Sequence, residues 1–234
     1  MKILGIDTSS DICSVCLIDD TTLIKELHLN NGKTHSENLV PLMKELMDSC
    51  KINFKDIDLI AINKGPGSFT GIRIGISTIK AIAEVHNIKI VGVTSLKSLS
   101  YNEIDGRQNN TIISLIDARN NQVYCGVFKP QEDDIYMAED INEVLESIKD
   151  YVDENTIFVG NGAVMHKELI QNLFEMQLKF SENNDQSSVS TALAGFEIFK
   201  TGNFDNADTI LPFYLRKSQA ERMKEINNNG NNNT

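Results

Sequence analysis

Hydrophobic and polar residues along the first half of the chain form blocks of two kinds. Short apolar runs bounded by polar turns predict strands, and longer stretches with helical spacing predict helices. A helix is expected to start at Thr34, which forms a capping-box pattern with Glu37, and Pro41 inside it predicts a kink or a late start. The expected elements are strands at 2–7, 12–19 and 21–29, a helix ending near 50, a strand at 57–63, a helix from near 71, a strand at 88–93 and a short helix from 94.

The second half repeats much of this order. Two strand-like runs flank Arg119–Asn121 as a hairpin, and Asp140 with Glu143 caps a helix. The other expected elements are a strand at 156–160, helices at 163–174 and 189–200, and an extended segment at 210–216. Such a duplication predicts two stacked α/β lobes with a cleft between them.

Equivalent positions in the two halves mark the candidate cleft. Asp7–Ser9 and Asp117–Arg119 both end a first strand, and Gly65–Gly67 matches Gly160–Gly162. We expect a first lobe at 1–104, a second lobe at 105–217, and a disordered Asn-rich tail at 218–234.

The composition narrows the class of protein. A formal net charge of −11 disfavours independent binding to the phosphate backbone of tRNA or any other nucleic acid. Without an apolar run of about 18 residues, we expect no membrane span and a cytoplasmic protein. Cys13 and Cys16 lie in a predicted strand, where positions three apart face opposite sides, so we expect buried thiols and not a metal or redox pair.

The most distinctive stretch is NKGPGSFTGIRIGISTIKAIA, at 63–83. A Walker loop would need Lys and a hydroxyl where this chain has Ile72 and Arg73, and a dinucleotide loop would need glycine at Thr70. What remains is a tight turn followed by Gly71 and Gly75 on a helix that is apolar around most of its circumference. Both tight packing within the chain and a subunit interface explain that pattern.

Candidate catalytic groups are sparse. Asp7-Thr8-Ser9 suits a phosphate-positioning turn or an ordinary β-turn. His35 begins an H-x-x-x-H metal pattern, but Leu39 stands in the second ligand position. Ser68 lacks the flanking glycines of a nucleophile elbow. We therefore expect no catalytic residue and no metal site.

Several segments together resemble the TsaB (YeaZ) family. They are ILGIDTSSDICSVCLID, THSENLVPLM, NKGPGSFTGIRIGISTIKAIA, GVTSLKSLS, DARNNQVYCGVF and LPFYLR, in family order over residues 1 to 217. The resemblance implies the duplicated fold of actin, heat-shock ATPases and sugar kinases (ASKHA), in which each lobe has a mixed sheet flanked by helices.

The resemblance also implies a function. Family members are non-catalytic partners that bind and activate TsaD, which transfers threonylcarbamoyl to N6 of adenosine 37 in tRNAs reading ANN codons. TsaE, an ATPase, joins this pair, so ATP is used by the wider complex and no cofactor is expected in the isolated chain. Relatives also form homodimers through the same face. A free-standing ASKHA ATPase or kinase, or a metal-dependent peptidase, is the alternative.

By similarity, the partner interface lies on the helices that start near His35 and Gly71. The residues assigned to it are His35, Leu39, Met43, Leu46, Gly71, Ile72, Arg73, Gly75, Ile76 and Ile79. The residues assigned to a vestigial nucleotide site are Asp7, Thr8, Ser9, Gly160 and Gly162.

Overall fold

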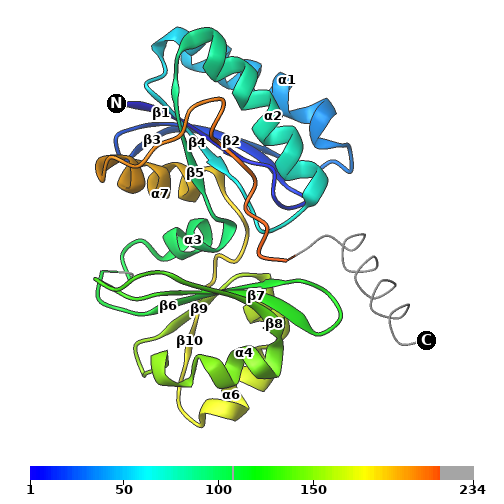
Figure 1. The fold of residues 1–234 in the computed structure, drawn as a ribbon, viewed down its shortest axis with the longest axis vertical. Helices are drawn as coiled ribbons and strands as arrows, with labels where there is room; N and C mark the ends of the chain where they lie inside the picture. The colour runs from blue at the N-terminus through cyan, green and yellow to red at the C-terminus, as the bar shows by residue number, and fades with distance from the viewer. Residues whose placement is uncertain (107, 217–234) are drawn as a thin grey trace, which may run out of the picture.

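Two five-stranded sheets with the same topology form the framework of the molecule (Figure 1). The computed structural model describes residues 1–106 and 108–216. In the first sheet the strand order is β3 (Thr22–Leu29), β2 (Cys13–Asp19), β1 (Lys2–Asp7), β4 (Leu59–Asn63) and β5 (Lys89–Val93). In the second it is β8 (Ile135–Asp140), β7 (Gln122–Phe128), β6 (Ile112–Asp117), β9 (Ile157–Val159) and β10 (Lys179–Phe180).

In each sheet the first three strands in sequence pair with one another in antiparallel order. The last two strands run parallel to the first strand and extend the sheet on its other side. The predicted duplication is thereby confirmed. β8 and β10, which the sequence pattern did not predict, complete the second sheet.

Helices cover both faces of the first sheet. The helices are α1 (His35–Cys50), α2 (Phe69–His86), α3 (Ser95–Ser100), α4 (Ile141–Ser147), α5 (Asn161–Met165), α6 (Lys167–Phe174) and α7 (Ser188–Lys200). Short 3₁₀ turns lie at Phe54–Asp56, Tyr101–Glu103 and Lys149–Tyr151. Figure 1 shows α1 and α2 side by side on the outer face, α7 on the inner face, α3 between the lobes, and α4 and α6 beyond the second sheet.

The start of α1 agrees with its sequence signals. Thr34 and Glu37 form the predicted capping box, with the Thr34 amide and hydroxyl both donating to the Glu37 carboxylate. Pro41 lies inside the helix on its exposed side, and the helix still begins at His35, so it does not start late.

The two cysteines of the C-x-x-C stretch face opposite sides of β2. Cys13 packs in the core under α1 and α2, and Cys16 packs in the core under α7. Burial raises the pKa of Cys13 to about 11 and that of Cys16 to about 12, so both remain protonated thiols at neutral pH. The expectation of two separate buried thiols is confirmed.

Residues 187–216 return to the first lobe. The strands of the first sheet do lie within 1–104, and those of the second within 105–180. However, we assigned all of 105–217 to the second lobe, and α7 instead packs on β1, β2, β4 and β5. The predicted tail at 218–234 lies outside the described residues.

After α7 the chain crosses the first lobe as a segment without regular helix or strand, here termed the strap (residues 203–216). Asp205 exchanges two backbone hydrogen bonds with Ile90, Ile210 is buried in the outer core, and the Phe213 amide donates to the Lys64 carbonyl. The strap therefore covers the free edge of β5.

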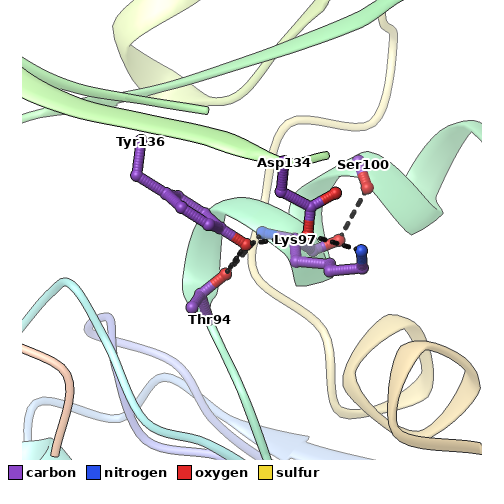
Figure 2. Close-up of polar contacts among 5 residues, drawn as sticks. All are labelled: Thr94, Lys97, Ser100, Asp134 and Tyr136. Carbon is purple, nitrogen blue, oxygen red and sulfur yellow. Dashed lines mark hydrogen bonds and ion pairs between the residues drawn. The ribbon is translucent and has the colours of Figure 1, made fainter. Parts of the chain in front are cut away.

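An interlobe cluster joins α3 to the start of β8 (Figure 2). Lys97 Nζ donates to Asp134 Oδ2 at 2.6 Å, and the Tyr136 hydroxyl donates to the same carboxylate oxygen at 3.2 Å. Thr94, the N-cap of α3, donates its hydroxyl to the Tyr136 oxygen at 3.2 Å. Because Lys97 and Asp134 are both mostly buried, this contact fixes the two lobes to each other.

Candidate functional site

Asp7, at the end of β1, points into the protein and not into the cleft. Its Oδ1 accepts hydrogen bonds from the Ser9 amide and hydroxyl, both at 2.8 Å, and its Oδ2 accepts from Asn63 Nδ2. Burial raises the pKa of this carboxyl, and the hydrogen bonds partly oppose that rise. The oxygens that a metal-orienting acid would use are thus engaged by protein donors.

Asn63, at the end of β4, is the hub of this buried network. Its Oδ1 accepts from the Gly65 amide at 3.0 Å and from the Ser95 hydroxyl at 2.6 Å. Its Nδ2 also donates to Gln186 Oε1 at 3.2 Å. Asn63 was not among the predicted site residues, although an amide at the end of a buried strand is a recognisable signal.

The cleft between the lobes consists of two adjoining hollows of about 220 and 510 Å³. Both lobes line it, and its charged lining residues include Asp11, Asp117, Asp185 and Arg119. Three carboxylates against one guanidinium make a poor environment for the phosphates of a nucleotide.

Of the five residues assigned to a vestigial nucleotide site, only Ser9 lines this cleft. Asp7 and Thr8 are fully buried. A Cβ on Gly160 would lie 2.3 Å from the Leu115 carbonyl oxygen, and one on Gly162 would lie 2.9 Å from the Leu115 carbonyl carbon. These two glycines allow the start of α5 to pack on β6, so Asp7, Thr8, Gly160 and Gly162 have structural roles and do not line the cleft.

The glycines of α2 face the turn after β1. A Cβ on Gly71 would lie 2.0 Å from the Thr8 carbonyl oxygen, and a Cβ on Gly75 would lie 2.4 Å from Thr8 Oγ1. The Thr8 hydroxyl donates to the Gly71 carbonyl at 2.8 Å, and Ser68 caps the helix by accepting from the Gly71 amide. The segment that packs on Gly71 and Gly75 therefore belongs to this chain. The glycine pattern is explained by tight packing within the chain and not by a subunit interface.

His35 supports the same turn. Its Nε2 lies 2.8 Å from the Ser10 carbonyl oxygen, and its ring lies within 2.8 Å of where a Gly71 Cβ would be. Leu39, one turn later, is 1% exposed and packs in the core. Within 1–106 and 108–216, no group of three or more His, Cys, Asp or Glu side chains is arranged to hold a metal ion.

Most of the ten residues assigned to the partner interface are core residues. His35 is partly buried and Arg73 is exposed. The other eight are buried between the helices and the first sheet: Leu39, Met43, Leu46, Gly71, Ile72, Gly75, Ile76 and Ile79. This part of the assignment was wrong because the stripe that defines an amphipathic helix is the one its own sheet covers.

Both helices also carry apolar residues that the first sheet does not fully cover. Val40 on α1 is 56% exposed and Val85 on α2 is 77% exposed. Ala81 is exposed, and Ile74 is partly exposed. We call these four residues the outer face.

No helix within the described residues is both long and apolar enough to cross a membrane.

Comparison with known proteins places this architecture in a family. A family model described as TsaD, tRNA N6-adenosine threonylcarbamoyltransferase, matches residues 23–224. The tRNA threonylcarbamoyladenosine biosynthesis protein TsaB of Bacillus subtilis (strain 168) is 31% identical over 232 residues, covering 94% of this chain and 96% of that protein. The chain belongs to the TsaB (YeaZ) family.

Solved structures agree with a TsaB fold. A Pseudomonas aeruginosa protein described as similar to the peptidase YeaZ superposes with a TM-score of 0.77 at 23% identity, covering 92% of this chain and 99% of that one. The ROK hexokinase of Thermus thermophilus superposes with a TM-score of 0.55 at 10% identity, covering 86% and 100%. This TsaB-family chain therefore has the duplicated ASKHA fold shared with sugar kinases.

Proposed function

We propose that this TsaB-family chain is a non-catalytic subunit that binds and activates TsaD during formation of N6-threonylcarbamoyladenosine at position 37 of tRNAs reading ANN codons. The observation that carries the proposal is the outer face on α1 and α2. It leaves Val40 and Val85 largely in solvent on two neighbouring helices, and exposed apolar side chains are a feature of protein interfaces.

The site geometry supports a non-catalytic role. The Asp7 carboxylate accepts hydrogen bonds from Ser9 and Asn63, and the cleft is lined by three carboxylates. In this proposal the pair acts in the cytoplasm, TsaE joins it, and ATP is used by the wider complex and not by this chain. A second copy would occupy the outer face when the partner is absent.

Co-purification tests the proposal. A Val40→Asp/Val85→Asp variant should lose binding to TsaD from the same organism, because two buried carboxylates at an apolar interface are unpaired. Leu173→Asp is the matched control, since Leu173 is an exposed apolar residue (39%) on α6 of the other lobe. The readout is the amount of TsaD retained, with circular dichroism to show that each variant is folded.

A reconstituted modification assay completes the test. Omitting this chain should reduce tRNA threonylcarbamoylation, and the double variant should behave like the omission. Retention of TsaD by the double variant would place the interface elsewhere. Magnesium-dependent ATP hydrolysis or peptide cleavage by the isolated chain would favour the kinase or peptidase alternatives.

A further inference from the structure

Arg73, an exposed residue on the second turn of α2, is held by two aromatic rings. Its guanidinium carbon lies 5.8 Å from the centre of the Phe69 ring and 5.7 Å from that of Tyr214. The two rings are stacked on each other, with centres 4.8 Å apart and planes 10° apart. Arg73 Nε donates to the Tyr214 hydroxyl at 2.9 Å. The side chain is thus oriented by its Nε hydrogen bond and lies close to both rings.

One of these rings is brought from the far end of the chain. Tyr214 lies in the strap, 141 residues from Arg73 in sequence. Its neighbour Phe213 is anchored by the hydrogen bond to Lys64 and by an edge contact with Tyr136 of the interlobe cluster, 5.7 Å between ring centres. The strap therefore holds Tyr214 in place to orient Arg73.

The charge of Arg73 is unpaired within the described part of the chain. No carboxylate oxygen of residues 1–106 or 108–216 forms an ion pair with it within 4.0 Å. Arginine normally presents its terminal nitrogens to a carboxylate or phosphate as a planar fork. In a chain of net charge −11, an exposed, oriented and unpaired guanidinium is a site prepared for an anionic group.

We propose that the Arg73–Phe69–Tyr214 cluster recognises an Asp or Glu side chain of the protein that docks on the outer face. This inference rests on the proposed function, because Arg73 and the outer-face residues Ile74, Ala81 and Val85 share α2. Arginine and tyrosine are enriched among the residues that dominate interface affinity, and a pre-organised side chain loses less entropy on binding. A carboxylate is favoured over a tRNA phosphate because the acidic chain repels a nucleic-acid backbone.

The test measures the dissociation constant of the full chain with TsaD by isothermal titration. Arg73→Gln should weaken binding by about 10-fold to 100-fold, and Arg73→Lys by about 10-fold, because lysine keeps the charge but lacks the fork. Tyr214→Phe keeps the stacked ring and loses the hydroxyl acceptor, so about a 2-fold to 5-fold loss is expected.

Lys89→Gln is the matched control. Lys89 also lies over two aromatic rings, 5.3 Å from the centre of Phe199 and 4.4 Å from that of Phe204, but it is on β5 and not on α2. Its loss should leave the dissociation constant within about 2-fold. A panel of TsaD variants with single exposed Asp→Asn or Glu→Gln changes should contain one that weakens binding to the wild-type chain but not to Arg73→Gln.

The outcomes separate this inference from the proposed function. Unchanged affinity of Arg73→Gln, with binding still lost in Val40→Asp/Val85→Asp, overturns the carboxylate site and leaves the proposed function standing. If neither variant affects binding, the carboxylate site is overturned and the interface lies elsewhere on the chain; the proposed function itself fails if the wild-type chain neither binds TsaD nor stimulates modification. If Arg73→Gln weakens binding of tRNA to the complex but not binding of TsaD, the anion is a phosphate and the inference is wrong.

Discussion

Thr8, in the turn after β1, packs closely against two glycines of α2. Its hydroxyl donates to the Gly71 carbonyl, its own carbonyl lies where a Gly71 Cβ would be, and its Oγ1 lies where a Gly75 Cβ would be. Thr8 is fully buried. The two glycines are therefore explained by helix-to-turn packing, without a ligand or a partner.

Replacing Gly75 by leucine tests this packing. The new Cβ would meet Thr8 Oγ1 at 2.4 Å, so we expect the free energy of unfolding to fall by about 1–3 kcal/mol. Ala81→Leu, on an exposed position of the same helix, should change it by less than about 0.5 kcal/mol. Urea denaturation of both variants gives the comparison, and equal stabilities would show that the turn yields.

The candidate site could be predicted from the sequence only in part. The failure of residues 63–83 to match either phosphate loop is visible in the residues themselves. Which side of α2 packs on the sheet is not visible in the sequence. A helix that is apolar around most of its circumference has no single apolar stripe to mark the side that faces the sheet. Gly71 and Gly75 were consequently taken as surface, although buried, and Val85, with 77% exposure, was overlooked.

At the scale of elements, signals carried by local chemistry were reliable. The predicted caps at Thr34 and Asp140 both lie where helices begin. The strand β8 was missed because its side chains are almost all partly exposed, so the apolar alternation of a strand is weak. The helix expected at 163–174 is broken at His166, which separates α5 from α6, and no breaking residue marks this point in the sequence.

The interlobe cluster should contribute measurably to stability. Lys97→Met leaves the Asp134 carboxylate with only the Tyr136 hydroxyl among the contacts of Figure 2, so we expect a loss of about 1–2 kcal/mol in the free energy of unfolding.

Lys149→Met serves as its control. Lys149 pairs with Glu146 at 2.5 Å, but the two side chains are 42% and 69% exposed, so the expected loss is below about 0.5 kcal/mol. Both variants are compared by thermal and urea unfolding. A similar small effect for Lys97→Met would mean that the lobes are held together by their apolar contacts alone.

For the whole molecule, the duplicated order of strands was predictable because each half repeats it within about a hundred residues. The return of α7 to the first sheet was not predictable from the sequence. Periodicity identifies a helix at 189–200 but does not indicate which of two sheets it covers. Only the contacts of Ala192 and Ala194 with Ile3, Leu59 and Val93 in one inner core reveal the answer.

A fragment experiment tests the resulting division. Residues 1–104 alone should fail to fold cooperatively, because the inner face of the first sheet would lose α7. Residues 94–186 contain the whole second sheet together with α3, α4, α5 and α6, and this fragment should be soluble and show dispersed amide resonances. Adding 187–216 to 1–104 in trans should restore helical and sheet signals, and cooperative folding of 1–104 by itself would contradict the assignment.

The same crossing imposes an order on biosynthesis. A ribosome releases the strands of the first sheet long before α7, with the second lobe made in between. At about 5–20 residues per second, the roughly 100 residues from the end of β5 to the end of α7 require about 5–20 s. During that interval the nascent chain displays an uncovered apolar sheet face. The half of the protein that is translated first is therefore the half that finishes folding last, and chaperones that bind nascent chains would find their substrate there.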